Sequence, residues 1–167
     1  MSNGEKKTLK DLKNLGEAMG MKPWNNLGPE PEYFLEDADY VSIAEKRMTQ
    51  LMDTGTNNPF GNLTTSKIRN ILTIVNDIHS EVINNQDEVL SQGIVDRIRH
   101  VKVRLAYEAG RERDSGEKVK KIKKFIETAE LIKGIDHIGQ SRTRFLRYFN
   151  YLEALVAYHR FLGGKDK

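Results

Sequence analysis

Apolar residues recur every three or four positions along most of the chain from residue 40 onward. This spacing places apolar side chains on one face of an α-helix. No segment shows the alternation of apolar and polar residues that is typical of a half-buried β-strand. The pattern therefore predicts an all-α fold. Its clearest run has one apolar face made of Ile68, Ile71, Leu72, Val75, Ile78 and Val82.

Turn-forming residues divide this pattern into separate helices. Thr64 or Thr65 is a suitable N-cap for one of them and Ser141 for another, because a hydroxyl oxygen accepts a hydrogen bond from an otherwise unpaired backbone amide. The sequence "GIDHIGQS" (134–141) is expected to end one helix before Ser141 starts the next. We predict a bundle of about five helices, over 40–53, 64–82, 94–112, 116–133 and 142–162.

The N-terminal part of the chain has a different character. A weak helix is predicted over 8–20, and the proline-rich stretch "MKPWNNLGPEPEY" (21–33) interrupts both helix and strand patterns. We therefore divide the chain into a peripheral extension with a linker, residues 1–38, and a helical bundle domain, residues 39–167.

The last predicted helix is apolar around almost its whole circumference. A helix of this kind is buried, either at the centre of a bundle or partly against another subunit. We expect it to be central, with a second, partly aromatic side available for self-association. That side comprises Leu146, Tyr151, Ala154, Ala157, Tyr158 and Phe161.

Charge is unevenly distributed, although the net charge is only +3. Residues 1–62 carry 7 basic and 10 acidic side chains, whereas residues 63–167 carry 20 basic and 14 acidic ones. Within 94–124 there are 11 basic residues and 5 acidic ones, so pairing inside this segment cannot neutralise it. Such local asymmetry favours an anionic partner.

The helix predicted over 94–112 carries this positive charge in two stripes. Arg97, Arg104 and Arg111 are seven residues apart and share one flank of the apolar face, and Arg99 and Lys102 lie on the other flank with Arg113. Arginine suits phosphate because its planar fork donates two hydrogen bonds. The alternative is a solvated face whose cations pair with the chain's own carboxylates. A third basic group opens the last helix, where cations oppose the helix dipole; it comprises Arg142, Arg144 and Arg147.

Several functional classes are excluded or disfavoured. Cysteine is absent, which excludes disulfides and cysteine-ligated metals, and the lack of a signal peptide or membrane span predicts a cytoplasmic protein without membrane contact. Asp77 and Glu81 share a helix face but are expected to bind no metal, and Asp136–His137 is a weak acid–base pair in a predicted loop. His159 is expected to be a core histidine. We predict no catalytic residue, no metal and no cofactor.

Four stretches resemble a known family: "LTTSKIRNIL" (63–72), "VRLAYEAGRE" (103–112), "FIETAELIKGIDHIG" (125–139) and "YLEALVAYHRFLGG" (151–164). In this order they are similar to the small subunit of the type III-A CRISPR effector, the Csm complex. The resemblance implies a small, non-catalytic helical protein that stacks in several copies beside guide RNA and target RNA, with other complex subunits as partners.

The resemblance and the charge pattern together define a set of candidate RNA-binding residues. Those inside the matching stretches are Lys67, Arg69, Arg104, Tyr107 and Arg111, and those chosen from helical geometry alone are Arg97, Arg99 and Lys102. Arg142 is added from the basic group that opens the last helix. Two alternatives remain at this point: a helical scaffold or regulator that binds protein or DNA, and a metal-dependent nuclease that uses Asp77 and Glu81.

Overall fold

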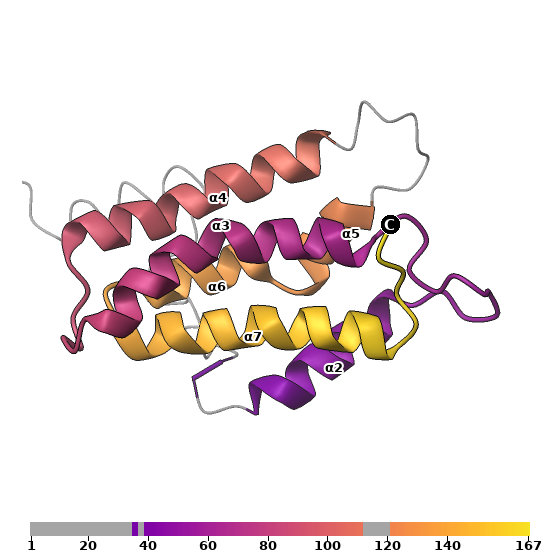
Figure 1. The fold of residues 1–167 in the computed structure, drawn as a ribbon, viewed down its shortest axis with the longest axis horizontal. Helices are drawn as coiled ribbons and strands as arrows, with labels where there is room; N and C mark the ends of the chain where they lie inside the picture. Colours follow the sequence, from indigo (N-terminus) through magenta and orange to yellow (C-terminus); the bar gives the residue numbers. More distant parts are fainter. Residues whose placement is uncertain (1–34, 37–38, 112–120) are drawn as a thin grey trace, which may run out of the picture. The chain divides into compact units, whose positions relative to one another are not determined.

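Six α-helices make up the secondary structure of the residues that the computed structural model describes, which are 35–36, 39–111 and 121–167 (Figure 1). No strand is assigned within these ranges, so the prediction of an all-α fold is confirmed. None of the described helices is long and apolar enough to cross a membrane. The helices are α2 (Tyr40–Leu51), α3 (Thr65–Asn84), α4 (Gln92–Arg111), α5 (Lys121–Thr128), α6 (Leu131–Ile138) and α7 (Arg142–Phe161).

Four predicted helices are confirmed with ends shifted by no more than two residues. Both predicted N-caps also form: the Thr64 hydroxyl accepts from the Lys67 amide at 3.3 Å, and the Ser141 hydroxyl accepts from the Arg144 amide at 3.2 Å. Local hydrogen-bonding chemistry is therefore sufficient to start α3 and α7.

The single helix predicted over 116–133 is wrong at its C-terminal part. The structure breaks it after Thr128, and α6 then continues through "GIDHI" to Ile138. Glu130 adopts a left-handed conformation at the break, where its carboxylate pairs with Arg47 of α2 and Lys133. Contacts from other helices thus hold a turn that the local sequence does not signal.

Helix α7 is central, as predicted, and packs against α2, α3 and α6. Tyr151 was expected on its spare side, but this residue is fully buried and its hydroxyl donates to the Ala129 carbonyl at 3.0 Å. The Tyr148 hydroxyl likewise donates to the Leu131 carbonyl. The hydroxyl groups of two buried tyrosines therefore satisfy carbonyl groups at the α5–α6 break, which allows these large side chains to be buried.

The chain divides into residues 1–32 and residues 33–167. Within the second unit Leu35 is buried, its carbonyl accepts from Arg147, and Glu36 pairs with Arg144 at 2.8 Å. The weak helix predicted over 8–20, the linker over 21–33 and the start of a helix near 116 lie outside the described residues.

Candidate nucleic-acid interface

A groove runs between α3 and α4. It consists of two open hollows, of about 480 and 330 Å³, that share Ile74, Asp77 and Arg104 in their walls. Consecutive antiparallel helices place the first turns of α3 beside the last turns of α4, so Asn70 and Arg111 line the same end. In this groove the stripe of Arg97, Arg104 and Arg111 on α4 lies beside α3.

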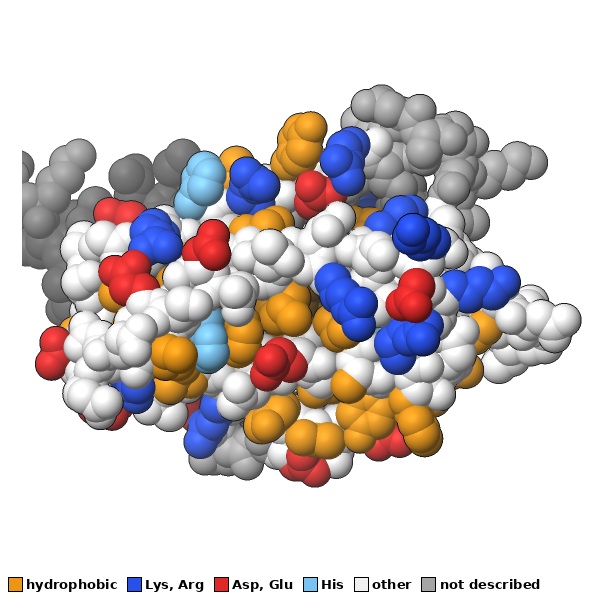
Figure 2. All heavy atoms as spheres, viewed as in Figure 1, with side chains coloured by type: hydrophobic (Ala, Val, Ile, Leu, Met, Phe, Trp, Pro, Cys, Tyr) orange, Lys and Arg blue, Asp and Glu red, His pale blue; other side chains and the backbone are white. Residues whose placement is uncertain are grey.

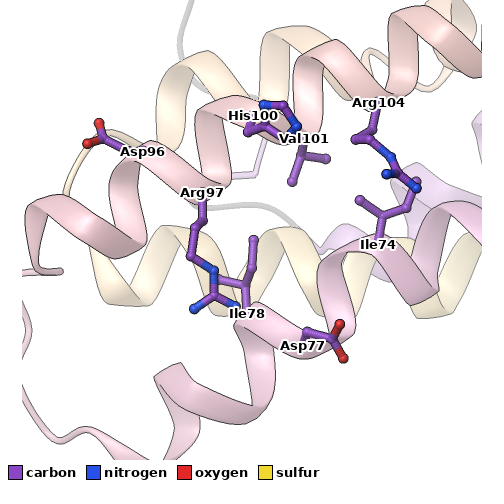
Figure 3. Close-up of a pocket in the computed structure, with 8 residues that line it drawn as sticks. All are labelled: Ile74, Asp77, Ile78, Asp96, Arg97, His100, Val101 and Arg104. Atoms are coloured by element: carbon purple, nitrogen blue, oxygen red, sulfur yellow. The ribbon is translucent and has the colours of Figure 1, made fainter.

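The three arginines of the stripe all lie in this groove. Arg97 and Arg104 line the larger hollow, and Arg104 and Arg111 line the smaller one. Figure 3 shows Arg97 and Arg104 extending from α4 toward α3, close to Ile78 and Ile74. Their stems therefore lie over apolar side chains while their guanidinium groups stay at the open side of the groove.

Two of these arginines are paired with carboxylates. Arg97 contacts Glu81 of α3, and Nη2 of Arg111 lies 3.0 Å from Oε2 of Glu108. Arg104 forms no ion pair with any residue that the structure describes. Exposed pairs of this kind contribute only about 0–1 kcal/mol, so solvent or a polyanion can replace the carboxylate.

The basic side chains on the opposite flank of α4 also pair with carboxylates. Arg99 lies 3.8 Å from Asp96, and Lys102 Nζ lies 2.6 Å from Asp136 of α6. The count of carboxylates within 94–124 did not include Asp136 or Glu81, because both lie outside that segment. The fold brings Glu81 and Asp136 from α3 and α6 to the basic helix.

The remaining candidates lie in three places. Lys67 and Arg69 lie in the first turns of α3, at the end of the groove that Arg111 lines, and Tyr107 is 60 % exposed on α4. Arg142 lies apart from them, where its Nε donates to the carbonyl of Val82 near the end of α3. The structure thus gathers most of the candidates along α3 and α4 and gives Arg142 a capping contact.

The groove has mixed charge. Asp77, Asp96 and Glu108 line it together with the arginines, and His100 lies between Arg97 and Arg104. Figure 2 shows basic and acidic side chains interspersed over α3 and α4, whereas apolar side chains gather along the edge formed by α7 and α2. Arginine and carboxylate side chains therefore lie close together along the groove.

The described residues contain no cluster of three or more side chains able to hold a metal ion. Asp77 and Glu81 are exposed, and Glu81 is engaged by Arg97. Asp136 and His137 were predicted in a loop, but they lie on α6, where Asp136 pairs with Lys102 and His137 Nδ1 lies 2.8 Å from the Lys133 carbonyl oxygen. These positions give no support to acid–base chemistry.

His159 is a core histidine, as predicted. It is fully buried, its Nε2 lies 2.7 Å from the Leu63 carbonyl oxygen, and its Nδ1 lies 3.1 Å from Thr65 Oγ1. Since a carbonyl only accepts, Nε2 carries the proton. Burial lowers the pKa of His159, and Arg160 lowers it further, while the Leu63 hydrogen bond and Asp166 raise it. The net effect favours the neutral ring.

The candidate RNA-binding residues chosen from the sequence did not include the basic residues of the C-terminal stretch "LGGKDK" (162–167). The structure places Lys165 against the first turn of α3 through a backbone hydrogen bond to Thr65. The signal that could have found it is the pair Gly163–Gly164 shortly after the predicted end of the last helix, because glycine permits close approach of the chain.

The described part of the chain is a helical bundle with a groove of mixed charge between α3 and α4. The comparison with known proteins is specific: the family Csm2 Type III-A matches residues 44–165. The chain belongs to this Csm2 family, and family membership makes it a subunit of a type III-A CRISPR complex.

Three relatives share the name "CRISPR system Cms protein Csm2". The protein from Enterococcus italicus is 39 % identical over 104 residues, covering 61 % of this chain and 69 % of the relative. That from Mycobacterium tuberculosis is 32 % identical over 105 residues, covering 63 % and 79 %. That from Streptococcus thermophilus is 31 % identical over 132 residues, covering 79 % and 98 %.

Proposed function

We propose that this small subunit binds the sugar–phosphate backbone of guide and target RNA along the α3–α4 groove, without catalysing a reaction. One observation carries the proposal: three arginines spaced by seven residues line one groove, and Arg104 among them has no carboxylate partner in the described part of the chain. Base pairing between guide and target supplies sequence recognition, so this subunit needs only backbone contacts.

Several copies are proposed to stack along the effector filament, where effective concentration multiplies weak contacts. The outer side of α7 supports self-association because Phe161 is 79 % exposed and neighbours exposed Ala157 and half-buried Tyr158. Light scattering over a range of protein concentrations measures this association directly.

Fluorescence anisotropy with labelled single-stranded RNA of several sequences, titrated with salt, tests RNA binding. The proposal expects weak binding that is independent of sequence and decreases linearly with log salt. Binding to an acidic protein subunit without RNA binding would instead support the scaffold alternative, and preference for one duplex DNA sequence would support the regulator alternative.

Removing the carboxylates that engage the arginines is expected to strengthen RNA binding. The double substitution Glu81→Gln and Glu108→Gln leaves side-chain size unchanged and frees Arg97 and Arg111 for phosphate. We expect affinity for RNA to increase several-fold at low salt, while the free energy of unfolding decreases by roughly 0–2 kcal/mol for the exposed Arg97–Glu81 pair and the partly exposed Arg111–Glu108 pair.

The matched control is Glu45→Gln with Glu127→Gln, which changes the net charge equally at exposed positions on α2 and α5. An equal increase in affinity in both double variants would show that total charge, and not the groove, determines binding.

A further inference from the structure

The stretch that follows α7 turns back onto the bundle. The carbonyls of Lys165 and Asp166 accept hydrogen bonds from the amides of Thr65 and Ser66, at 2.8 and 3.3 Å, and the Ser66 hydroxyl donates to the Asp166 carbonyl at 2.6 Å. First-turn amides of a helix have no intrahelical acceptor. The tail, residues 163–167, therefore satisfies backbone groups of α3 that otherwise require water.

His159 fixes this tail from inside the bundle. The Thr65 hydroxyl lies 3.1 Å from both His159 Nδ1 and the Lys165 carbonyl oxygen, and the Phe60 ring packs 4.5 Å from the imidazole. A Cβ atom at position 164 would lie 2.1 Å from Cε1 of His159, so only glycine fits there. The backbone of the tail is thus held by contacts that do not involve its charged side chains.

Docking of the tail places cations next to one another. Lys165 and Lys167 are exposed beside the turn that carries Lys67 and Arg69. Arg160 donates to the Gly164 carbonyl at 3.0 Å and pairs with Asp166 at 3.4 Å. The tail, Arg160 and the first turns of α3 therefore bring together five basic side chains and one acidic side chain, Asp166. The basic ones are Lys67, Arg69, Arg160, Lys165 and Lys167.

The surface formed by the tail and the first turns of α3 adjoins the α3–α4 groove. Asn70, one helical turn after Ser66, lines the hollow that also contains Arg104 and Arg111. A path of separated cations matches a polymer with one charge per nucleotide better than a compact anion, and lysines act on phosphate as point charges.

We propose that the docked tail is a second part of the RNA-binding surface, in which Lys165 and Lys167 contact phosphates and the fit of Gly164 against His159 positions them. This inference rests on the proposed function of the groove. With the tail included, the proposed RNA path runs from α4, around the first turn of α3, to the end of α7.

The test compares three variants of the full chain by RNA anisotropy and salt titration. Lys165→Gln with Lys167→Gln is expected to lower affinity several-fold at low salt and to reduce the slope of log affinity against log salt by up to about 1.4 for a single strand. The control Lys46→Gln with Lys124→Gln removes the same charge from exposed positions on α2 and α5 and should leave both quantities near wild type. Gly164→Ala keeps every charge but displaces the tail, and the expected loss of affinity is similar to that of the lysine variant.

Wild-type affinity in the lysine variant, together with lost affinity in a groove variant, would overturn the inference and leave the proposed function intact. If the wild-type protein binds no RNA but binds polyglutamate through these lysines, both RNA proposals fail. Should Gly164→Ala prevent folding, judged by circular dichroism, the lysine variant decides the matter alone, because its substitutions are on exposed side chains. Unchanged affinity in a folded Gly164→Ala protein would refute the positioning role.

Discussion

Replacing Arg97, Arg104 and Arg111 together by Gln is expected to reduce the affinity of the isolated protein for single-stranded RNA by roughly tenfold or more at low salt. Three phosphate contacts account for a slope of log affinity against log salt of about 2, so the salt dependence should flatten by up to that amount. All three side chains lie at the groove with exposed guanidinium groups, so their removal leaves the core intact. Anisotropy at four or five salt concentrations measures both quantities.

The control for this experiment removes the same charge elsewhere. Lys46, Lys124 and Lys133 are exposed on α2, α5 and α6, and their replacement by Gln should change affinity little. An equal loss of affinity in both triple variants would show that RNA binding depends only on the overall electrostatic potential of the protein. An unchanged slope in the arginine variant would favour contact with acidic protein subunits.

Acidification is expected to destabilise the bundle through His159. Burial lowers its pKa below the ordinary value of 6.5, so the unfolded chain takes up a proton at a pH where the folded protein does not. The unfolded state then binds more protons, and stability falls as pH decreases below about 6.5, by at most about 1.4 kcal/mol per pH unit for one histidine. The loss continues until pH passes the lowered pKa of the folded state. Urea unfolding at pH 7.0 and 5.5 measures it.

His79 contributes in the same direction, since burial lowers its pKa too, against the opposing effect of Glu153, and its ring stacks on Phe149. His159→Gln should therefore reduce the pH dependence of stability and leave the part that comes from His79. A His159→Gln protein with the full wild-type pH dependence would contradict the assignment, as would an NMR titration that places His159 above 6.5.

The relative positions of the candidate residues were predictable from the sequence where these residues lie on a single helix. The spacing of Arg97, Arg104 and Arg111 predicts that they share one flank of α4, and in the structure all three line the α3–α4 groove. Their pairing was not predictable, because Glu81 lies on α3 and reaches Arg97 only through helix packing. The partner of Lys102 was not predictable for the same reason, because Asp136, 2.6 Å away, lies on α6.

Periodicity and capping chemistry by themselves determined the all-α fold, the limits of α2, α3, α4 and α7, and the central position of α7, because these depend on interactions within about four residues and on burial of an apolar face. Only the tertiary structure decided the break at Glu130, the burial of Tyr151, the partners of the arginines and the docking of the tail on α3. Each of these joins residues distant in sequence, so its free energy arises from contacts that exist only after the helices have packed.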